Sequence, residues 1–198
     1  MITKRGFIAG AATAAAVAAS VSWRTALTDD PQIARLAAVP FDYVVLNERY
    51  ADARRFADAL AEQGVPPLPI AGDAGTLWYN TLGRLVAGGR RHIAGIGAPM
   101  DLFILETLAR DAGLRVRFQG HHDCRGTSTL SHSFQAQARG AQIARAVELA
   151  RHEWPLALAA SLPRTAAALN VRKTHVRLST DVERSPDHPG MLISWVLA

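Results

Sequence analysis

The sequence predicts an α/β fold, namely a Rossmann-like three-layer domain with a parallel sheet and a C-terminal β-hairpin. Short apolar runs of strand length begin near residues 42, 67, 92 and 115, so they repeat at about 24 residues. Segments of helical length lie between these runs, and one strand plus one helix fills a repeat of this size. Near the C-terminus, an alternating segment, a turn and a final apolar run indicate the hairpin.

Size and composition favour one ordinary globular domain. The chain has 198 residues, of which 49% are hydrophobic, so it can bury a core after a targeting segment is removed. Its net charge is +5, but the arginines are spread along the sequence and no nucleic-acid motif is present, so we expect no nucleic-acid partner. Cys124 is the only cysteine, which excludes an internal disulfide and Cys₂-type zinc sites.

The N-terminal residues carry a candidate export signal. Thr3-Lys4-Arg5-Gly6-Phe7-Ile8 is followed by an uncharged, alanine-rich run that ends at Trp23. Alanine is nearly neutral for membrane insertion, so this run is a poor anchor, and the small residues at 16–18 and 20–22 suit cleavage. The motif resembles the twin-arginine signal peptide, and it departs from that pattern at Lys4, where the first arginine normally stands.

This resemblance covers residues 1–23 only. It implies that the protein folds in the cytoplasm and then crosses to the periplasm. Proteins exported in this way commonly carry a cofactor, or travel bound to an enzyme that does. An ordinary secretory signal is one alternative, and an uncleaved segment that anchors the protein to the membrane is another.

The remaining chain divides into a linker and a single α/β domain. Residues 24–40, with breaks at Asp29-Asp30-Pro31 and Pro40, are expected to link the signal to a domain over 41–198. Its predicted strands are 42–47, 67–71, 92–97 and 114–119, and its predicted helices are 51–63, 74–86, 101–112 and 135–153.

Several residues mark the ends or the positions of these elements. Glycines at 64, 88–89 and 113 are expected to end the first three helices. Pro67 and Pro69 lack ladder donors, so their strand suits an edge of the sheet. The helix over 101–112 is strongly apolar, and we expect it to be the most buried helix, with Phe103 in the core. Residues 175–180 and 191–197, joined by a turn over 185–190, form the predicted hairpin.

A ligand site is expected beyond the carboxyl ends of the parallel strands, where open α/β sheets bind their ligands. Polar and titratable residues gather after these ends, whereas the opposite turns carry mostly Gly and Arg. The candidate ligand-binding residues are Glu48, Arg49, Asp73, Gly95, Gly97 and His121.

Two features of this edge have competing interpretations. The segment Gly95–Asp101 has a glycine turn before a helix, as anion sites do, but it lacks the third glycine of the dinucleotide motif and a P-loop lysine, so a structural tight turn is favoured. Glu48 and Asp73 could form an acid–base pair, although Asp73 also stands where the second helix needs an N-cap.

A second candidate site follows the fourth predicted strand. His122, Asp123 and His132, with Cys124 as a fourth ligand and His121 facing away, could hold a divalent transition metal if the chain turns there. The alternative is a polar loop with hydrogen-bonded histidines. Cys124 could be an activated thiolate beside Arg125, or an inert thiol.

The leading hypothesis is an exported, non-catalytic protein that binds a small ligand or a redox partner at the carboxyl edge of its sheet. One alternative is a small hydrolase or transferase that uses Glu48, Asp73 and the 121–124 cluster. Another is an interaction subunit that is exported together with a cofactor-bearing enzyme. The sequence has no nucleophile elbow and no nucleotide fingerprint, which disfavours the enzyme classes that depend on them.

Overall fold

The computed structural model describes residues 41–125, 129–137, 140–166, 173–181 and 185–198. The expected signal peptide and linker, residues 1–40, lie outside these ranges. In the described part of the chain, no helix combines the length and the apolar character that crossing a bilayer requires.

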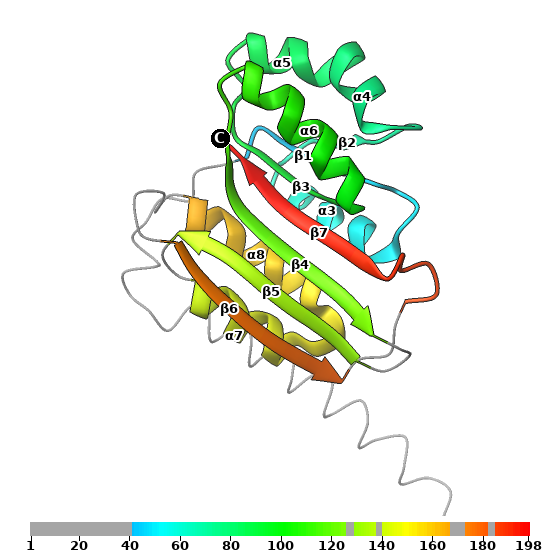
Figure 1. Cartoon of the computed structure of the whole chain (residues 1–198), viewed down its shortest axis with the longest axis vertical. Coiled ribbons are helices and arrows are strands. Elements are labelled where there is room, and N and C mark those ends of the chain that lie inside the picture. The colour runs from blue at the N-terminus through cyan, green and yellow to red at the C-terminus, as the bar shows by residue number, and fades with distance from the viewer. Residues whose placement is uncertain (1–40, 126–128, 138–139, 167–172, 182–184) are drawn as a thin grey trace, which may run out of the picture.

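Seven strands form one mixed sheet in the order β2-β1-β3-β7-β4-β5-β6 (Figure 1). The strands are β1 (Tyr43–Leu46), β2 (Pro67–Pro69), β3 (Ile93–Gly97), β4 (Val116–Arg125), β5 (Thr129–Gln137), β6 (Lys173–Asp181) and β7 (Met191–Leu197). The helices are α3 (Ala51–Ala61), α4 (Ala74–Leu77), the π-helical turn η1 (Trp78–Leu82), α5 (Gly83–Ala87), α6 (Pro99–Asp111), α7 (Gly140–Ala150), the 3₁₀ turn η2 (Arg151–Glu153) and α8 (Trp154–Ala166). The α/β class predicted from the sequence is confirmed.

The first half of the chain forms the predicted βα units. Strand β1 pairs in parallel with both β2 and β3, and β2, with its two prolines, lies at the edge of the sheet. Helices α3 and α6 end before Gly64 and Gly113, which adopt φ values of 86° and 82°. Glycine reaches this left-handed region without a steric penalty, so the predicted helix stops are confirmed.

The second half differs from the predicted topology. Strands β6 and β7 exist, but they do not pair with each other: β6 pairs with β5 at an edge, whereas β7 lies between β3 and β4 and is antiparallel to both. The sheet is therefore mixed, and the predicted pairing of residues 175–180 with 191–197 in a C-terminal hairpin was wrong. The physical reason is the burial of β7, which is apolar on both faces and so belongs in the centre of the sheet.

The segment after residue 119 is also different from the prediction. Strand β4 continues to Arg125 and forms a hairpin with β5, and α7 begins only at Gly140. The predicted end of the fourth strand at 119 and the predicted helix start at 135 were wrong. In β5 the buried residues Leu130, His132 and Phe134 alternate with more exposed ones, which is the period of a strand.

Two apolar clusters cover the two faces of the sheet. Val44 and Leu46 of β1 belong to the cluster that includes α3, α7 and α8, whereas Val45 between them belongs to the cluster that includes α4, α5 and α6. The helices therefore form outer layers on both sides of the strands (Figure 1). On the second side, α4, α5 and α6 cover the β1–β3–β7 half, and Figure 1 shows the front of β4, β5 and β6 without a labelled helix over it.

Helix α6 was predicted correctly, but its buried face was not. Leu102, Leu105 and Ala109 are buried against the sheet, whereas the Phe103 side chain is 65% exposed. The expectation that Phe103 lies in the core was wrong. The helical period turns residue 103 away from the face formed by 102, 105 and 109, and the apolar composition of the segment obscured this face.

Candidate functional site

The predicted acid–base pair at the carboxyl edge is not supported by the role of Asp73. Its carboxylate caps α4, since it accepts hydrogen bonds from the Thr76 backbone N–H at 2.8 Å and from the Thr76 hydroxyl at 2.8 Å. The bond from the backbone N–H, reinforced by that from the hydroxyl, lowers the pKa of Asp73. Glu48 and Arg49 follow β1 and are exposed. Asp73 is therefore a helix cap, which was the second of the two interpretations.

The glycine turn after β3 holds a side chain of the protein itself. Asp101 Oδ2 accepts from the Ala98 backbone N–H at 2.8 Å and from Asn47 Nδ2 at 3.0 Å. A Cβ atom on Gly97 would lie only 2.5 Å from this oxygen. The carboxylate thus occupies the N-terminus of α6, where a bound anion would otherwise lie, and the tight-turn interpretation has the support of the structure.

Gly95 also has a structural role. A Cβ atom at this position would lie 2.2 Å from the ring of Trp195, the register partner of Gly95 on the neighbouring strand β7. Both glycines of β3 are buried, so their predicted role in ligand binding has no support in this geometry. They allow close packing of Trp195 and Asp101 instead.

The turn over 185–190, which precedes β7, packs on the start of α3. Asp187 Oδ2 accepts from the Ala51 backbone N–H at 2.7 Å and from Arg54 at 3.2 Å. Ser185 donates to the buried carboxyl of Asp52 at 3.3 Å. Burial raises the pKa of Asp52, and Asp187 adds to this, against the opposing effects of Arg55 and Ser185. This turn therefore covers the carboxyl edge beside β1, which the sequence did not reveal.

The 121–124 cluster lies within β4, not in a loop after it. Because side chains alternate along a strand, His122 and Cys124 face the buried cluster, and His121 and Asp123 face the other side, where both are partly exposed. The proposed metal set of His122, Asp123, His132 and Cys124 is therefore divided between two faces. Within the described ranges, no group of three or more His, Cys, Asp or Glu residues is arranged to hold a metal ion.

The two histidines that do meet form a buried hydrogen-bonded pair. The Nδ1 atoms of His122 and His132 are 2.7 Å apart, and His122 Nε2 is 2.9 Å from Ser194 Oγ of β7. The Trp154 ring stacks on His122, with 4.2 Å between the ring centroids. Two nitrogens bound to one tetrahedral zinc would lie about 3.3 Å apart, so the shorter separation is that of a hydrogen bond.

Both histidines are neutral at pH 7. Burial, with His132 and His188 nearby, holds the pKa of His122 well below its ordinary value. Burial, with His188 nearby, lowers the pKa of His132 to about 3. A proton on one Nδ1 therefore bonds to the bare Nδ1 of the other ring. His132 Nε2 is buried and has no hydrogen-bond partner among the described residues.

The order serine, histidine, histidine matches the nucleophile, base and orienting group of a catalytic triad. However, Ser194, His122 and His132 have no exposed surface, so no substrate can reach the hydroxyl in this structure. A Cβ atom on Gly120 would lie 2.6 Å from Ser194 Oγ, which shows how closely the backbone of β4 packs there. The arrangement supports a polar network that joins β4, β5 and β7, and gives no support to hydrolysis.

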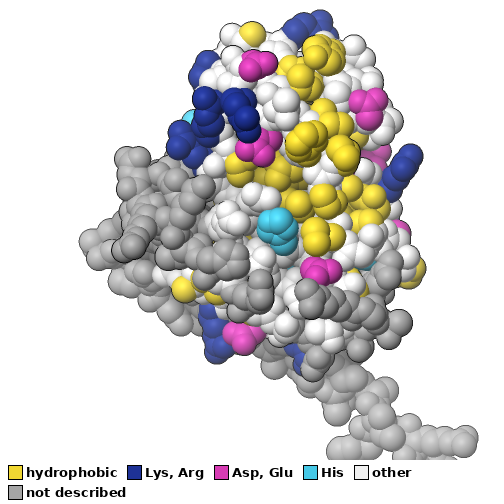
Figure 2. Space-filling view, in the orientation of Figure 1, with side chains coloured by type: hydrophobic (Ala, Val, Ile, Leu, Met, Phe, Trp, Pro, Cys, Tyr) yellow, Lys and Arg dark blue, Asp and Glu magenta, His cyan; other side chains and the backbone are white. Residues whose placement is uncertain are grey.

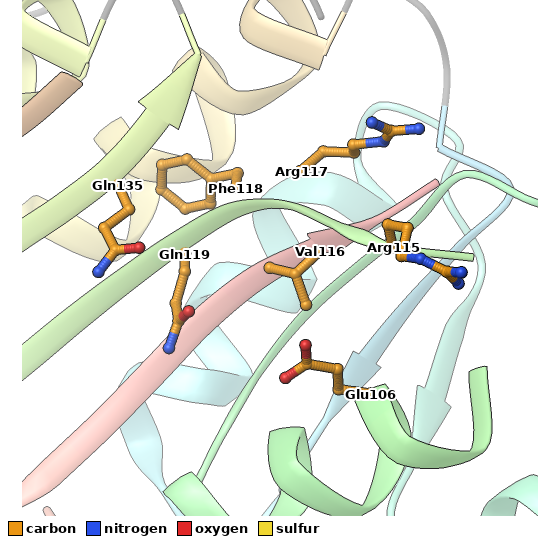
Figure 3. A pocket seen from close by; sticks show the side chains of 7 residues that line it. All are labelled: Glu106, Arg115, Val116, Arg117, Phe118, Gln119 and Gln135. Atoms are coloured by element: carbon orange, nitrogen blue, oxygen red, sulfur yellow. The ribbon is translucent and has the colours of Figure 1, made fainter. Parts of the chain in front are cut away.

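An accessible cavity of about 360 Å³ lies between α6 and the first residues of β4 (Figure 3). Its size is within the range that small-molecule sites occupy. Figure 3 shows Glu106, Val116 and Gln119 on one side of β4, with Gln135 beside Gln119. The cavity is lined by Glu106, Arg115, Val116, Arg117, Phe118, Gln119 and Gln135.

The polar groups of this cavity are held by defined contacts. Gln119 and Gln135 are register partners on adjacent strands, and Gln119 Nε2 is 3.1 Å from His121 Nε2. Arg115 donates to the carbonyls of Arg110 and Leu114 at 3.1 and 2.8 Å. Arg117 Nε donates to the Ala198 carbonyl at 3.3 Å. Both guanidinium groups are thus bonded to backbone carbonyls at the rim.

The cavity residues and Ser194 were not among the site residues predicted from the sequence. The available signal was the strand period: Gln119 and Gln135 are polar positions of strands whose neighbouring residues, Phe118 and Phe134, are buried. Such alternation indicates one sheet face that no helix covers. Of the predicted ligand residues, His121 alone contacts this site, through Gln119.

Comparison of the chain with models of protein families, with curated proteins and with solved structures found no match to any of them.

Proposed function

We propose that this chain is a non-catalytic α/β protein that binds a small polar ligand in the cavity between α6, β4 and β5. The cavity is the observation that carries the proposal, because donors and acceptors from three elements converge on it beside the apolar side chain of Val116. Small-molecule sites usually combine apolar walls with a few oriented polar groups, whereas here polar side chains predominate, which suits a polar ligand.

The other candidate positions support binding less well. The carboxyl edge, where the sequence predicted the ligand, is occupied by the Asp101 carboxylate at α6 and by the turn of Asp187 at α3. The histidine pair is buried in the core. The two histidines with strongly lowered pKa values therefore lie apart from the accessible cavity, and this separation favours binding over acid–base catalysis.

We further propose that the protein acts in the periplasm, on the basis of the twin-arginine-type motif at residues 3–8. In this proposal the ligand is a molecule of that compartment, or one that the protein carries there after folding in the cytoplasm. A cofactor-bearing enzyme exported with the chain remains the partner that such a signal implies.

The test is native mass spectrometry of the protein recovered from the periplasm. We expect a small-molecule adduct that is lost in the double variant Gln119→Ala/Gln135→Ala. The matched control is Ser131→Ala, since Ser131 lies on the same side of β5 but contacts Ser179 and does not line the cavity. Absence of an adduct, or an adduct that survives the double variant, would contradict the proposal.

A further inference from the structure

Exposed apolar side chains lie on α6 next to Glu106, the residue of this helix that lines the cavity. Phe103 lies one helical turn before Glu106, so the two residues share a face of the helix. The Phe103 and Met100 side chains are 65% and 61% exposed. Figure 2 shows hydrophobic side chains gathered on this front face of the molecule. An exposed apolar patch of this kind can serve as a contact surface for a ligand bound in the neighbouring cavity.

The polar part of the cavity matches hydroxyl groups. The Glu106 carboxylate accepts hydrogen bonds, and each of the Gln119 and Gln135 amides both donates and accepts. A hydroxyl group can donate to an acceptor or accept from a donor. Two adjacent hydroxyls can therefore bond to the two polar atoms of a planar carboxylate or amide. Gln119 Nε2 lies 3.1 Å from His121 Nε2, and this contact positions the amide beside the cavity.

The charges of the cavity do not favour an anionic ligand at the glutamines. In Figure 3 the guanidinium groups of Arg115 and Arg117 point away from Gln119 and Gln135. Arg115 is bonded to two backbone carbonyls, and Arg117 to one. The lining residue on α6 is Glu106, whose carboxylate pairs with Arg110 at 3.4 Å and would repel an anion placed directly against it.

The geometry points to a pyranose ring, that is a neutral saccharide unit, as the ligand of this cavity. Its apolar face would lie against the Phe103 ring, and its hydroxyls would bond to Glu106, Gln119 and Gln135. This inference rests on the proposed function, and it adds the chemical class of the ligand. Phe103 is then a specificity-determining residue, because its ring distinguishes a flat C–H face from an open-chain polyol.

The experiment is saturation-transfer-difference NMR on the full chain with separate probes: the methyl pyranosides of glucose, galactose and mannose, the open-chain polyol sorbitol, and the anion gluconate. We expect at least one pyranoside to receive saturation, and sorbitol and gluconate to receive none. Phe103→Leu should weaken pyranoside binding about twofold to tenfold, the range of aromatic contacts in proteins. Tyr79→Leu is the matched control, since the Tyr79 side chain is 72% exposed but lies on η1, which contributes no residue to the cavity, whereas Phe103 lies on α6 one turn from Glu106.

The outcomes separate this inference from the proposed function. If gluconate binds and Gln119→Ala abolishes it, the cavity is a ligand site but the pyranose assignment is wrong. If sorbitol binds as well as the pyranosides, or Phe103→Leu changes nothing, the stacking role of Phe103 is wrong. If a pyranoside binds equally well to Phe103→Leu and to Gln119→Ala, the sugar binds elsewhere and both proposals fail. If no probe binds, the pyranose assignment is overturned, and the native mass spectrum decides the proposed function.

Discussion

The Nδ1 atoms of His122 and His132 lie 2.7 Å apart on adjacent strands, in a part of the core that water does not reach. A neutral imidazole carries one N–H, and a ring with two would be a buried cation. The pair therefore keeps this hydrogen bond without a buried charge only if both rings are neutral. The Trp154 ring on one side and Ser194 on the other leave no polar solvent to stabilise an imidazolium. The pair therefore ties the packing of β4, β5 and β7 to its protonation state.

Acidification should destabilise the protein through this pair. The pKa values of both histidines are lowered in the folded state, that of His132 to about 3, against about 6.5 when unfolded. The unfolded chain therefore binds more protons as the pH falls, so this stability is fully present above about pH 7 and is lost as the pH falls below 6.5. Each histidine should contribute a slope of about 1.4 kcal/mol per pH unit.

The measurement is urea unfolding between pH 7.5 and pH 5, above the range in which most carboxylates titrate. His121→Gln is the control, because His121 lies on the other face of β4 and is partly exposed. This variant should keep the slope, whereas the double variant His122→Phe/His132→Leu should flatten it. An unchanged slope in the double variant would show that other groups cause the pH dependence.

Removing the hydroxyl of Ser194 should cost stability. Ser194→Ala leaves His122 Nε2 without its partner at 2.9 Å in a fully buried position. We expect the free energy of unfolding to fall by about 1–3 kcal/mol, the cost of a buried unsatisfied polar atom. Ser133→Ala, at a partly exposed position of β5, should change it by less than about 0.5 kcal/mol. Equal effects of the two substitutions would argue against the network.

Gly97→Ala should destabilise the protein through Asp101. The new Cβ atom would lie 2.5 Å from Asp101 Oδ2 and would force the carboxylate away from the Ala98 backbone N–H and from Asn47. A loss of about 1–3 kcal/mol is expected from such overpacking. In an Asp101→Ala background the same substitution should cost much less, and denaturant unfolding of all four proteins measures this coupling. Additive effects would mean that the clash is not with Asp101.

Two neighbouring apolar residues of α6 should differ sharply in their contribution to stability. Leu105→Ala removes a fully buried side chain and should cost about 2–5 kcal/mol. Phe103→Ala removes the larger side chain, but one that is 65% exposed, and should cost less than about 1 kcal/mol. Thermal or urea unfolding compares them directly. A larger loss for Phe103→Ala would mean that the ring is buried in solution, against a partner or a second copy.

Export should depend on the basic pair at the N-terminus. Lys4→Gln together with Arg5→Gln should leave the protein in the cytoplasm as a longer precursor, because the resemblance assigns these two residues to the recognised motif. Cell fractionation with detection of precursor and processed forms measures this. Lys4→Arg is the matched variant and should improve export. Continued export of the double variant would remove the twin-arginine interpretation.

The features that the sequence determined by itself are local ones, namely single helices, strands and caps. A helix shows its buried face at intervals of three and four residues and a strand at intervals of two, so both are visible in a short window. The helices α3 and α6, their glycine stops and the first three strands were predicted for this reason. The cap formed by Asp73 three residues before Thr76 is equally local.

Only the tertiary structure decided how distant segments meet. Ser194 contacts His122 across 72 residues of chain because β7, which is apolar on both faces, is buried between β3 and β4. That placement separates β4 from the parallel strands and extends the sheet through β5 and β6, so Gln119 and Gln135 lie side by side beyond the cover of α6. The order of the strands depends on burying the apolar faces of all strands and helices at once. A short stretch of sequence shows only the face of its own element, so it cannot predict that order.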